Sequence, residues 1–86
     1  MGRGMTRLWK NQVIYVLSLD DKPASFRWHG RSHRITHISE RRRIDKYWWR
    51  ERIWRDYYTV LTHSNMLVEI YHDLLTDRWY LQRVYD

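Results

Sequence analysis

The densest group of residues that could do chemistry lies between positions 41 and 55 of this 86-residue chain. Seven cations stand there against two acids, Asp45 and Glu51, and aromatic residues are interleaved with them. Cations neutralise phosphates, and flat rings offer surfaces on which bases stack. The pattern therefore indicates nucleic-acid binding, with single strands favoured. The cations are Arg41, Arg42, Arg43, Lys46, Arg50, Arg52 and Arg55, and the aromatic residues are Tyr47, Trp48, Trp49 and Trp54.

A second basic group surrounds Gly30, where Arg27 and Arg31 could reach a phosphate backbone from a hairpin tip. Both groups also have a plainer interpretation, because exposed charges are usually just solvated and aromatic rings usually just packed. Both interpretations stay open. The predicted nucleic-acid-binding residues are Arg27, Arg31, Arg41, Arg42, Arg43, Lys46, Trp48, Trp49, Arg50, Arg52 and Arg55, with Trp48 or Trp49 stacking on a base.

Catalytic and metal-binding patterns are sparse. The sequence holds no Gly-rich phosphate loop, no nucleophile elbow and no HExxH motif. His29, His33 and His37 recur every four residues, which would align metal ligands on a helix, but a turn at Gly30 interrupts that geometry. We therefore expect no catalytic residues, no metal and no cofactor.

The charge balance of the whole chain favours an anionic partner. Sixteen Lys and Arg residues stand against ten Asp and Glu residues, which leaves a formal net charge of +6. A positive field of this size attracts polyanions such as nucleic acid, or an acidic protein surface. There is no Cys, and the longest early apolar run, 13–17, is too short for a membrane span or a signal segment. We expect a cytoplasmic protein that does not bind membranes.

The length allows one hydrophobic core, since small domains already bury proportionally little surface. Residues 1–10 contain two Gly and three basic side chains and are predicted to be a flexible basic arm. Residues 11–86 then form a single β-rich domain.

Short runs of β-branched and aromatic residues between turn formers predict five to six strands. Ile35 and Ile38 are three residues apart, which suggests a β-bulge or a change of face between them. Segment 44–55 breaks the period of two and is predicted to be one short helix or an ordered loop. The expected fold is mainly β, a small antiparallel barrel or a strongly curved sheet. The predicted strands are 12–19, 24–29, 33–39, 57–62, 66–72 and 79–85.

The last strand is aromatic to its end, so we expect it to be buried. If it lies at a sheet edge, its unpaired backbone would invite a partner strand or a second copy, which leaves a homodimer open.

Four aromatic-rich motifs follow one another along the chain: Lys22–Arg31, Tyr47–Arg50, Arg55–Tyr58, and Asp73 with Trp79–Asp86. Their order resembles a bacterial family of small domains of unknown function. Members of that family occur alone or as a C-terminal tail on proteins resembling Y-family DNA polymerases in mutagenic-repair cassettes. The resemblance covers about residues 12–86, and this sequence departs from the family pattern at His33 and in lacking Gly at the Ser64-Asn65 turn. The resemblance implies a DNA-repair setting and identifies no binding residues.

Two functions are therefore predicted. The first is a nucleic-acid-binding accessory module of DNA repair or replication, acting on single-stranded or distorted DNA. The alternative is a protein-interaction module that docks a polymerase-like or other acidic partner through the same surface, because Trp, Tyr and Arg also dominate protein interfaces. A small enzyme is not expected.

Overall fold

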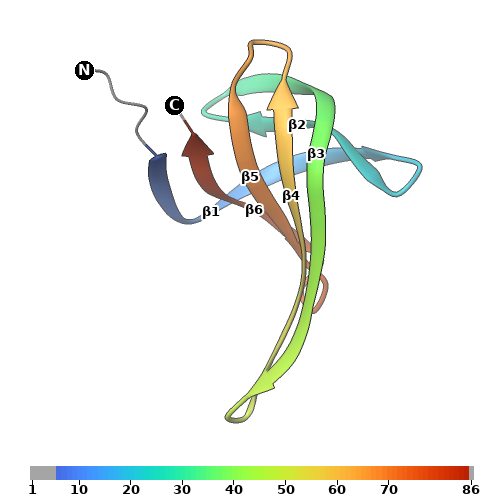
Figure 1. Cartoon of the computed structure of the whole chain (residues 1–86), viewed down its shortest axis with the longest axis vertical. Coiled ribbons are helices and arrows are strands. Elements are labelled where there is room, and N and C mark those ends of the chain that lie inside the picture. The colour runs from blue at the N-terminus through green and yellow to red at the C-terminus, as the bar shows by residue number, and fades with distance from the viewer. Residues whose placement is uncertain (1–5, 86) are drawn as a thin grey trace.

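Six antiparallel strands, in the order of the sequence, close into a small barrel (Figure 1). The computed structural model describes residues 6–85, with the side chains of residues 12–47 and 49–85. The predicted mainly β class and small antiparallel barrel are confirmed. The strands are β1 (Thr6–Leu19), β2 (Lys22–Trp28), β3 (Arg31–Trp48), β4 (Glu51–Thr62), β5 (Leu67–Asp73) and β6 (Arg78–Tyr85).

The barrel core forms where the alternation of each strand places apolar side chains inward. The register brings Val60 opposite Val68 and Val68 opposite Val84, so one layer of the core is built from three neighbouring strands. All the members are buried or nearly so. The buried core consists of Ile14, Phe26, Tyr58, Val60, Val68, Ile70, Leu81 and Val84.

β3 contains the irregularity that the spacing of its isoleucines predicts. Its register against β4 shifts between Ile35 and His37 and again between Ile38 and Glu40. The extra residues are Thr36 and Ser39, whose hydroxyls donate to the carbonyl oxygens of Leu61 and Thr59, each at 3.2 Å. The two bulges keep both isoleucines against the core and bend the strand around it.

The turns are built from residues that tolerate left-handed backbone. Asp20 and Asp21 both have positive φ, as do His29 and Gly30, which is the geometry that two-residue hairpins require. Asn65 takes this conformation (φ 64°) in the turn after β4. His33 stacks on Phe26 with ring centroids 5.1 Å apart.

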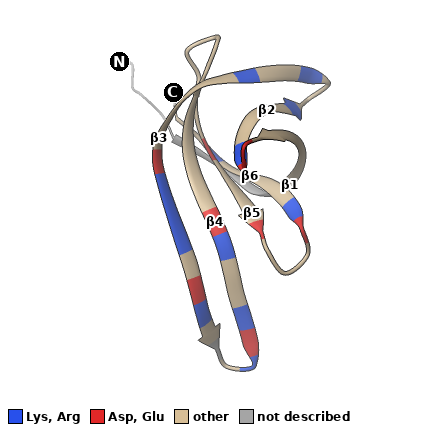
Figure 2. Cartoon of the chain, turned by 90° about the vertical axis from the view of Figure 1, so that its right-hand side faces the viewer, with Lys and Arg blue, Asp and Glu red and all other residues tan. Residues whose placement is uncertain are grey.

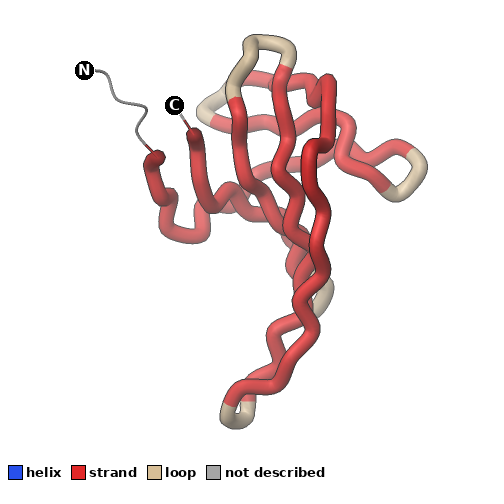
Figure 3. The backbone as a smooth tube through the Cα atoms, in the orientation of Figure 1, coloured by secondary structure: helices blue, strands red, loops and turns tan. Residues whose placement is uncertain are grey.

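Segment 44–55 is neither a helix nor a loop, so that prediction was wrong. β3 and β4 continue through it as a two-stranded ribbon, and the tube trace shows strand and turn throughout (Figure 3). β5 pairs with β4 only as far as Arg55 opposite Asp73. Residues 45–54, which we call the arm, therefore project beyond the barrel and help to give the molecule its longest dimension of 42 Å (Figure 1). No helix in the described residues is long and apolar enough to cross a membrane.

Two predictions about the chain ends also need correction. β1 begins at Thr6, and Thr6–Leu8 pair with β6, so the predicted arm of residues 1–10 extends too far; residues 1–5 lie outside the described part. β6 is not an edge strand, because it pairs with β5 on one side and β1 on the other. A homodimer through an open β6 edge therefore has no structural basis.

Candidate nucleic-acid interface

The β3–β4 hairpin sorts its charged residues onto two faces. Residues directly opposite each other in an antiparallel pair share a face, and successive residues alternate. The face that continues from the barrel interior, the inner face, carries Arg41, Arg43, Asp45 and Tyr47 on β3, and Arg52, Trp54, Asp56 and Tyr58 on β4. The opposite, outer face carries Arg42, Ile44, Lys46, Ile53, Arg55 and Tyr57. Figure 2 shows the cations interspersed with acids along both strands.

Asp56 organises the base of the inner face. Its carboxylate accepts hydrogen bonds from Arg43 Nε at 2.6 Å and Arg43 Nη2 at 2.9 Å, and a longer one from Arg41 Nη2 at 3.4 Å. Asp56 is buried, whereas half of each arginine side chain remains exposed. The carboxylate thus fixes the two guanidinium groups while leaving part of each turned toward solvent.

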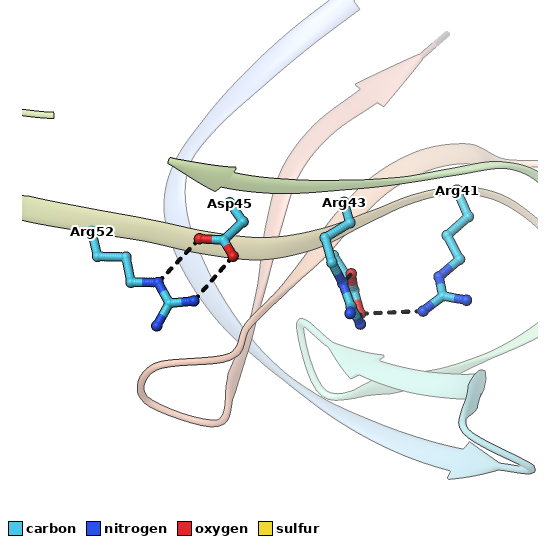
Figure 4. Close-up of polar contacts among 5 residues, drawn as sticks. Arg41, Arg43, Asp45 and Arg52 are labelled. Carbon is cyan, nitrogen blue, oxygen red and sulfur yellow. Dashed lines mark hydrogen bonds and ion pairs between the residues drawn. The ribbon is translucent and has the colours of Figure 1, made fainter. Parts of the chain in front are cut away.

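Further along the arm, Asp45 and Arg52 form a second pair across the strands. Arg52 donates from Nε and Nη2 to the two carboxylate oxygens of Asp45, both at 3.0 Å. Its guanidinium carbon also lies 4.4 Å from the ring centre of Trp54 and 5.7 Å from that of Tyr47. Arg41, Arg43, Asp45 and Arg52 all project from the same side of the hairpin (Figure 4).

These contacts shift the acid–base equilibria of the inner face. Hydrogen bonds from Arg43 are the main cause that lowers the pKa of Asp56, and the hydrogen bond from Arg52 lowers the pKa of Asp45. The pKa of the Arg43 and Arg52 guanidinium groups is raised by the same bonds. Both carboxylates are therefore ionised at neutral pH, and the arginines stay charged.

Trp49 occupies the tip of the arm in an unfavourable backbone conformation. It follows the last residue of β3 with φ +59°, in the left-handed region that bulky residues rarely adopt. Its side chain is 85% exposed, and that of the nearby Tyr47 is 75% exposed. Strained, exposed residues of this kind concentrate at functional sites. The tip therefore presents aromatic surface to solvent.

Both arginines of the outer face also lie over tyrosine rings. Arg42 pairs with the buried Glu69 at 3.4 Å and lies 5.0 Å from the ring centre of Tyr57. Arg55 donates to Tyr57 Oη at 3.1 Å and lies 4.6 Å from the ring of Tyr71. Tyr71 stacks in turn on Tyr80, with centroids 5.1 Å apart. Arg55 is half-buried in these contacts, whereas the side chain of Arg42 is as exposed as that of Arg43.

A polar cavity of about 360 Å³ opens where the arm leaves the barrel, and we call it the mouth. Its wall includes Arg41 and Arg43 from the inner face, with Tyr58 and Trp79, whose rings are 5.6 Å apart. His72 stacks on Trp79 at 4.4 Å, with the rings nearly parallel, and contacts Asp77 at 2.7 Å. The mouth thus extends the arginine-rich surface into an aromatic-walled recess.

The structure brings some of the predicted site residues together and separates others. Arg41, Arg43 and Arg52 share the inner face, whereas Arg42, Lys46 and Arg55 lie on the outer face. Among the described residues, Lys46 and Arg50 have no acidic partner within ion-pair distance. Trp49 is at the tip, and the side chain of Trp48 lies outside the described part. Arg27 and Arg31 flank the Gly30 turn, at the opposite end of β3 from the arm (Figure 1).

Sequence reasoning missed the residues that hold these cations in place. Asp56 and Glu69 are buried acids, and an acid in the middle of an apolar strand is itself a signal of a buried ion pair. Tyr58, Trp79 and His72 line the mouth but come from three different strands, which no local pattern links.

No set of three or more His, Asp or Glu side chains in the described part is placed to hold a metal ion. Comparison of the chain with protein-family models finds no match, and comparisons with curated proteins and with solved structures find no significant match.

Proposed function

We propose that this protein binds nucleic acid in single-stranded or distorted form, through the inner face of the β3–β4 hairpin and the tip of the arm. The observation that carries the proposal is the combination on one projecting hairpin of half-exposed, carboxylate-oriented arginines with the exposed Trp49 and Tyr47 rings. Guanidinium groups would contact phosphates while a ring stacks on a base.

The ion pairs of the inner face do not remove its capacity to bind phosphate. Arg41 and Arg43 share one carboxylate, Asp56, so this trio keeps a net positive charge. A guanidinium has five N–H donors, and the bidentate contact of Arg43 uses two of them. Orientation by Asp56 also reduces the side-chain entropy that phosphate binding would otherwise cost.

Unpaired bases suit this surface better than a regular duplex. Exposed rings gain stacking energy only from bases whose faces are accessible, at about 1–3 kcal/mol per base. Alternate residues along a strand recur about every 6.8 Å, so Arg41 and Arg43 can meet successive phosphates of an extended chain. An accessory role in DNA repair, as the motif resemblance implies, is the setting that we propose.

Fluorescence anisotropy with labelled single-stranded and duplex oligonucleotides tests the proposal. We expect the single strand to bind more tightly, and log affinity to fall with log salt at a slope of about 0.7 per phosphate contacted. Arg41→Gln should weaken binding about 5- to 30-fold, which corresponds to one charge-assisted contact of roughly 1–2 kcal/mol.

Arg34→Gln is the matched control. Arg34 is exposed on the same strand, outside the arm and the mouth, and its replacement removes the same unit of charge. We expect it to change affinity less than about twofold, since long-range charge is screened over about 8–10 Å. Absence of binding to both oligonucleotides at low salt, or equal losses in the two variants, would refute the inner face of the β3–β4 hairpin as the binding surface.

A further inference from the structure

β1 exposes a row of apolar side chains that the barrel core does not use. Val13, Tyr15, Leu17 and Leu19 alternate along one face of the strand and are between 47% and 75% exposed. The residues between them face the other way, with Ile14 in the core and Ser18 lining the mouth. This row, the β1 stripe, therefore lies on the opposite face of β1 from the mouth.

Cations border the stripe along β2 and β3. Arg27 is directly opposite Tyr15, Lys22 is opposite Leu19, and Arg34 follows on β3 opposite Ser25. Residues 22–39, which form β2 and the first half of β3, include no Asp or Glu. An apolar row with a one-sided cationic border is complementary to a segment that carries an apolar row beside acids.

The stripe also offers recesses for incoming side chains. A hollow of about 310 Å³ is lined by Tyr15, Leu17, Ser25 and Arg27, and one of about 260 Å³ by Val13, Tyr15 and Arg27. A larger groove of about 680 Å³ lies on the other side of β1, and its lining includes Tyr15, Arg78 and Asp77. Tyr15 thus stands between recesses, and the two on the β2 side have Arg27 and no acid in the wall.

We propose that the β1 stripe docks an acidic amphipathic helix of a partner protein, an interaction distinct from nucleic-acid binding. The stripe spans six residue steps, about 20 Å, which about 14 helical residues match in length. A second copy of this chain is a poorer occupant, because it would bring another Lys22, Arg27 and Arg34 border against the first. Because the stripe is on β1, facing away from the mouth, and the nucleic-acid surface is on the β3–β4 hairpin, one molecule can hold nucleic acid and the partner together.

The test uses the full chain, labelled with ¹⁵N, and two designed helical peptides of 18 residues. Both carry Leu at positions i, i+3, i+4 and i+7; one is bordered by Glu and the other by Lys at the same places. We expect the Glu peptide to bind at least about tenfold more tightly, with amide shifts centred on residues 13–19 and 25–27.

Leu17→Ser should reduce affinity for the Glu peptide about fivefold or more, which is the loss expected for one apolar anchor. Leu75→Ser is the matched control, because Leu75 is a similarly exposed leucine in the β5–β6 turn. Oligonucleotide affinity should be the same in both variants, which separates this proposal from the nucleic-acid one.

Several outcomes would overturn the docking proposal. Equal binding of the Glu and Lys peptides, or binding of neither, would contradict the selection of an acidic helix by the cations that border the stripe. Shifts confined to the arm would assign the peptide to the nucleic-acid surface. Preferential binding to phosphatidylserine vesicles, lost in Leu17→Ser, would make the stripe a lipid contact. A concentration-dependent dimer in sedimentation, also lost in Leu17→Ser, would make it a contact between copies.

Discussion

Asp56 is the residue that orients Arg41 and Arg43 on the inner face. It is buried, yet it serves two half-exposed cations from the neighbouring strand. A carboxylate in such a place contributes to folding through its hydrogen bonds and would be costly if left without partners. Asp56 therefore links the stability of the barrel to the geometry of the proposed phosphate contacts.

This linkage gives a pH-dependent stability difference between the wild type and Asp56→Asn. The pKa of Asp56 is lowered from its ordinary value of 3.8, so its stabilising effect is present above that pH and is lost as the pH falls through the folded-state pKa. We expect Asp56→Asn to lower the free energy of unfolding by about 1–3 kcal/mol at pH 7. The difference should shrink below about pH 4, as measured by urea unfolding.

Asp45→Asn provides the comparison for this experiment. Asp45 pairs with Arg52 on the exposed arm, where ion pairs contribute only about 0–1 kcal/mol. A loss at pH 7 as large as that of Asp56→Asn would show that burial of the carboxylate is not what matters.

We expect Trp49 to lower the free energy of unfolding of the protein and to strengthen its binding to single strands. Glycine adopts positive φ without steric cost, so Trp49→Gly should raise the free energy of unfolding by up to about 1 kcal/mol, measured by chemical denaturation. The same change removes a stacking ring and should weaken single-strand binding by about 1–3 kcal/mol. Trp49→Tyr should keep most of the affinity. Unchanged affinity in Trp49→Gly would exclude the tip from the interface.

At the scale of elements, the arm is an extension that the barrel does not need. Residues 45–54 pair mainly with one another, because the β4–β5 ladder stops at Arg55 opposite Asp73. At the base of the arm the Leu74 N–H still donates to the Trp54 carbonyl oxygen at 2.9 Å. Residues 45–54 carry three cations and two acids, so their removal changes the net charge by only one unit. The arm can therefore be removed while the overall charge of the protein is nearly kept.

Replacement of residues 45–54 by Asn-Gly should leave a folded barrel that no longer binds single strands well. Asn-Gly favours the tight turn that would join Ile44 to Arg55, which already face each other. We expect native-like circular dichroism and a loss of oligonucleotide affinity of at least about tenfold, well beyond the roughly twofold limit expected for one unit of charge away from the binding surface. Retained affinity in this variant would place the binding surface on the barrel itself.

The strands were more predictable than the faces of the arm. Local patterns sufficed for the hairpin at His29-Gly30 and for the bulge between Ile35 and Ile38. In residues 45–54 each face of the ribbon carries both apolar and charged side chains. The sequence therefore lacks the alternation of apolar and polar residues by which a strand is usually recognised. A ribbon that packs against nothing on one side has no need of strict alternation.

Across the whole molecule, the candidate site was predictable in composition but not in arrangement. The sequence shows that cations and rings gather in residues 41–55. Which arginine meets Asp56 depends on the register of β3 against β4, and the bulges at Thr36 and Ser39 set that register. The contact of Arg42 with Glu69 reaches across β4 from β3 to β5, so it follows from the order of the strands in the sheet and not from local sequence.

Closure of the barrel affects how the chain folds during its synthesis. Thr6–Leu8 pair with residues 83–85, so the last seam joins segments separated by almost the full sequence. During synthesis, the β3–β4 hairpin has only short-range partners and can assemble early, and β1 can pair with β2. The other edge of β1 must wait until β6 leaves the ribosome. Until then the nascent chain exposes that unpaired edge of β1, and this interval is when a chaperone would be most useful to it.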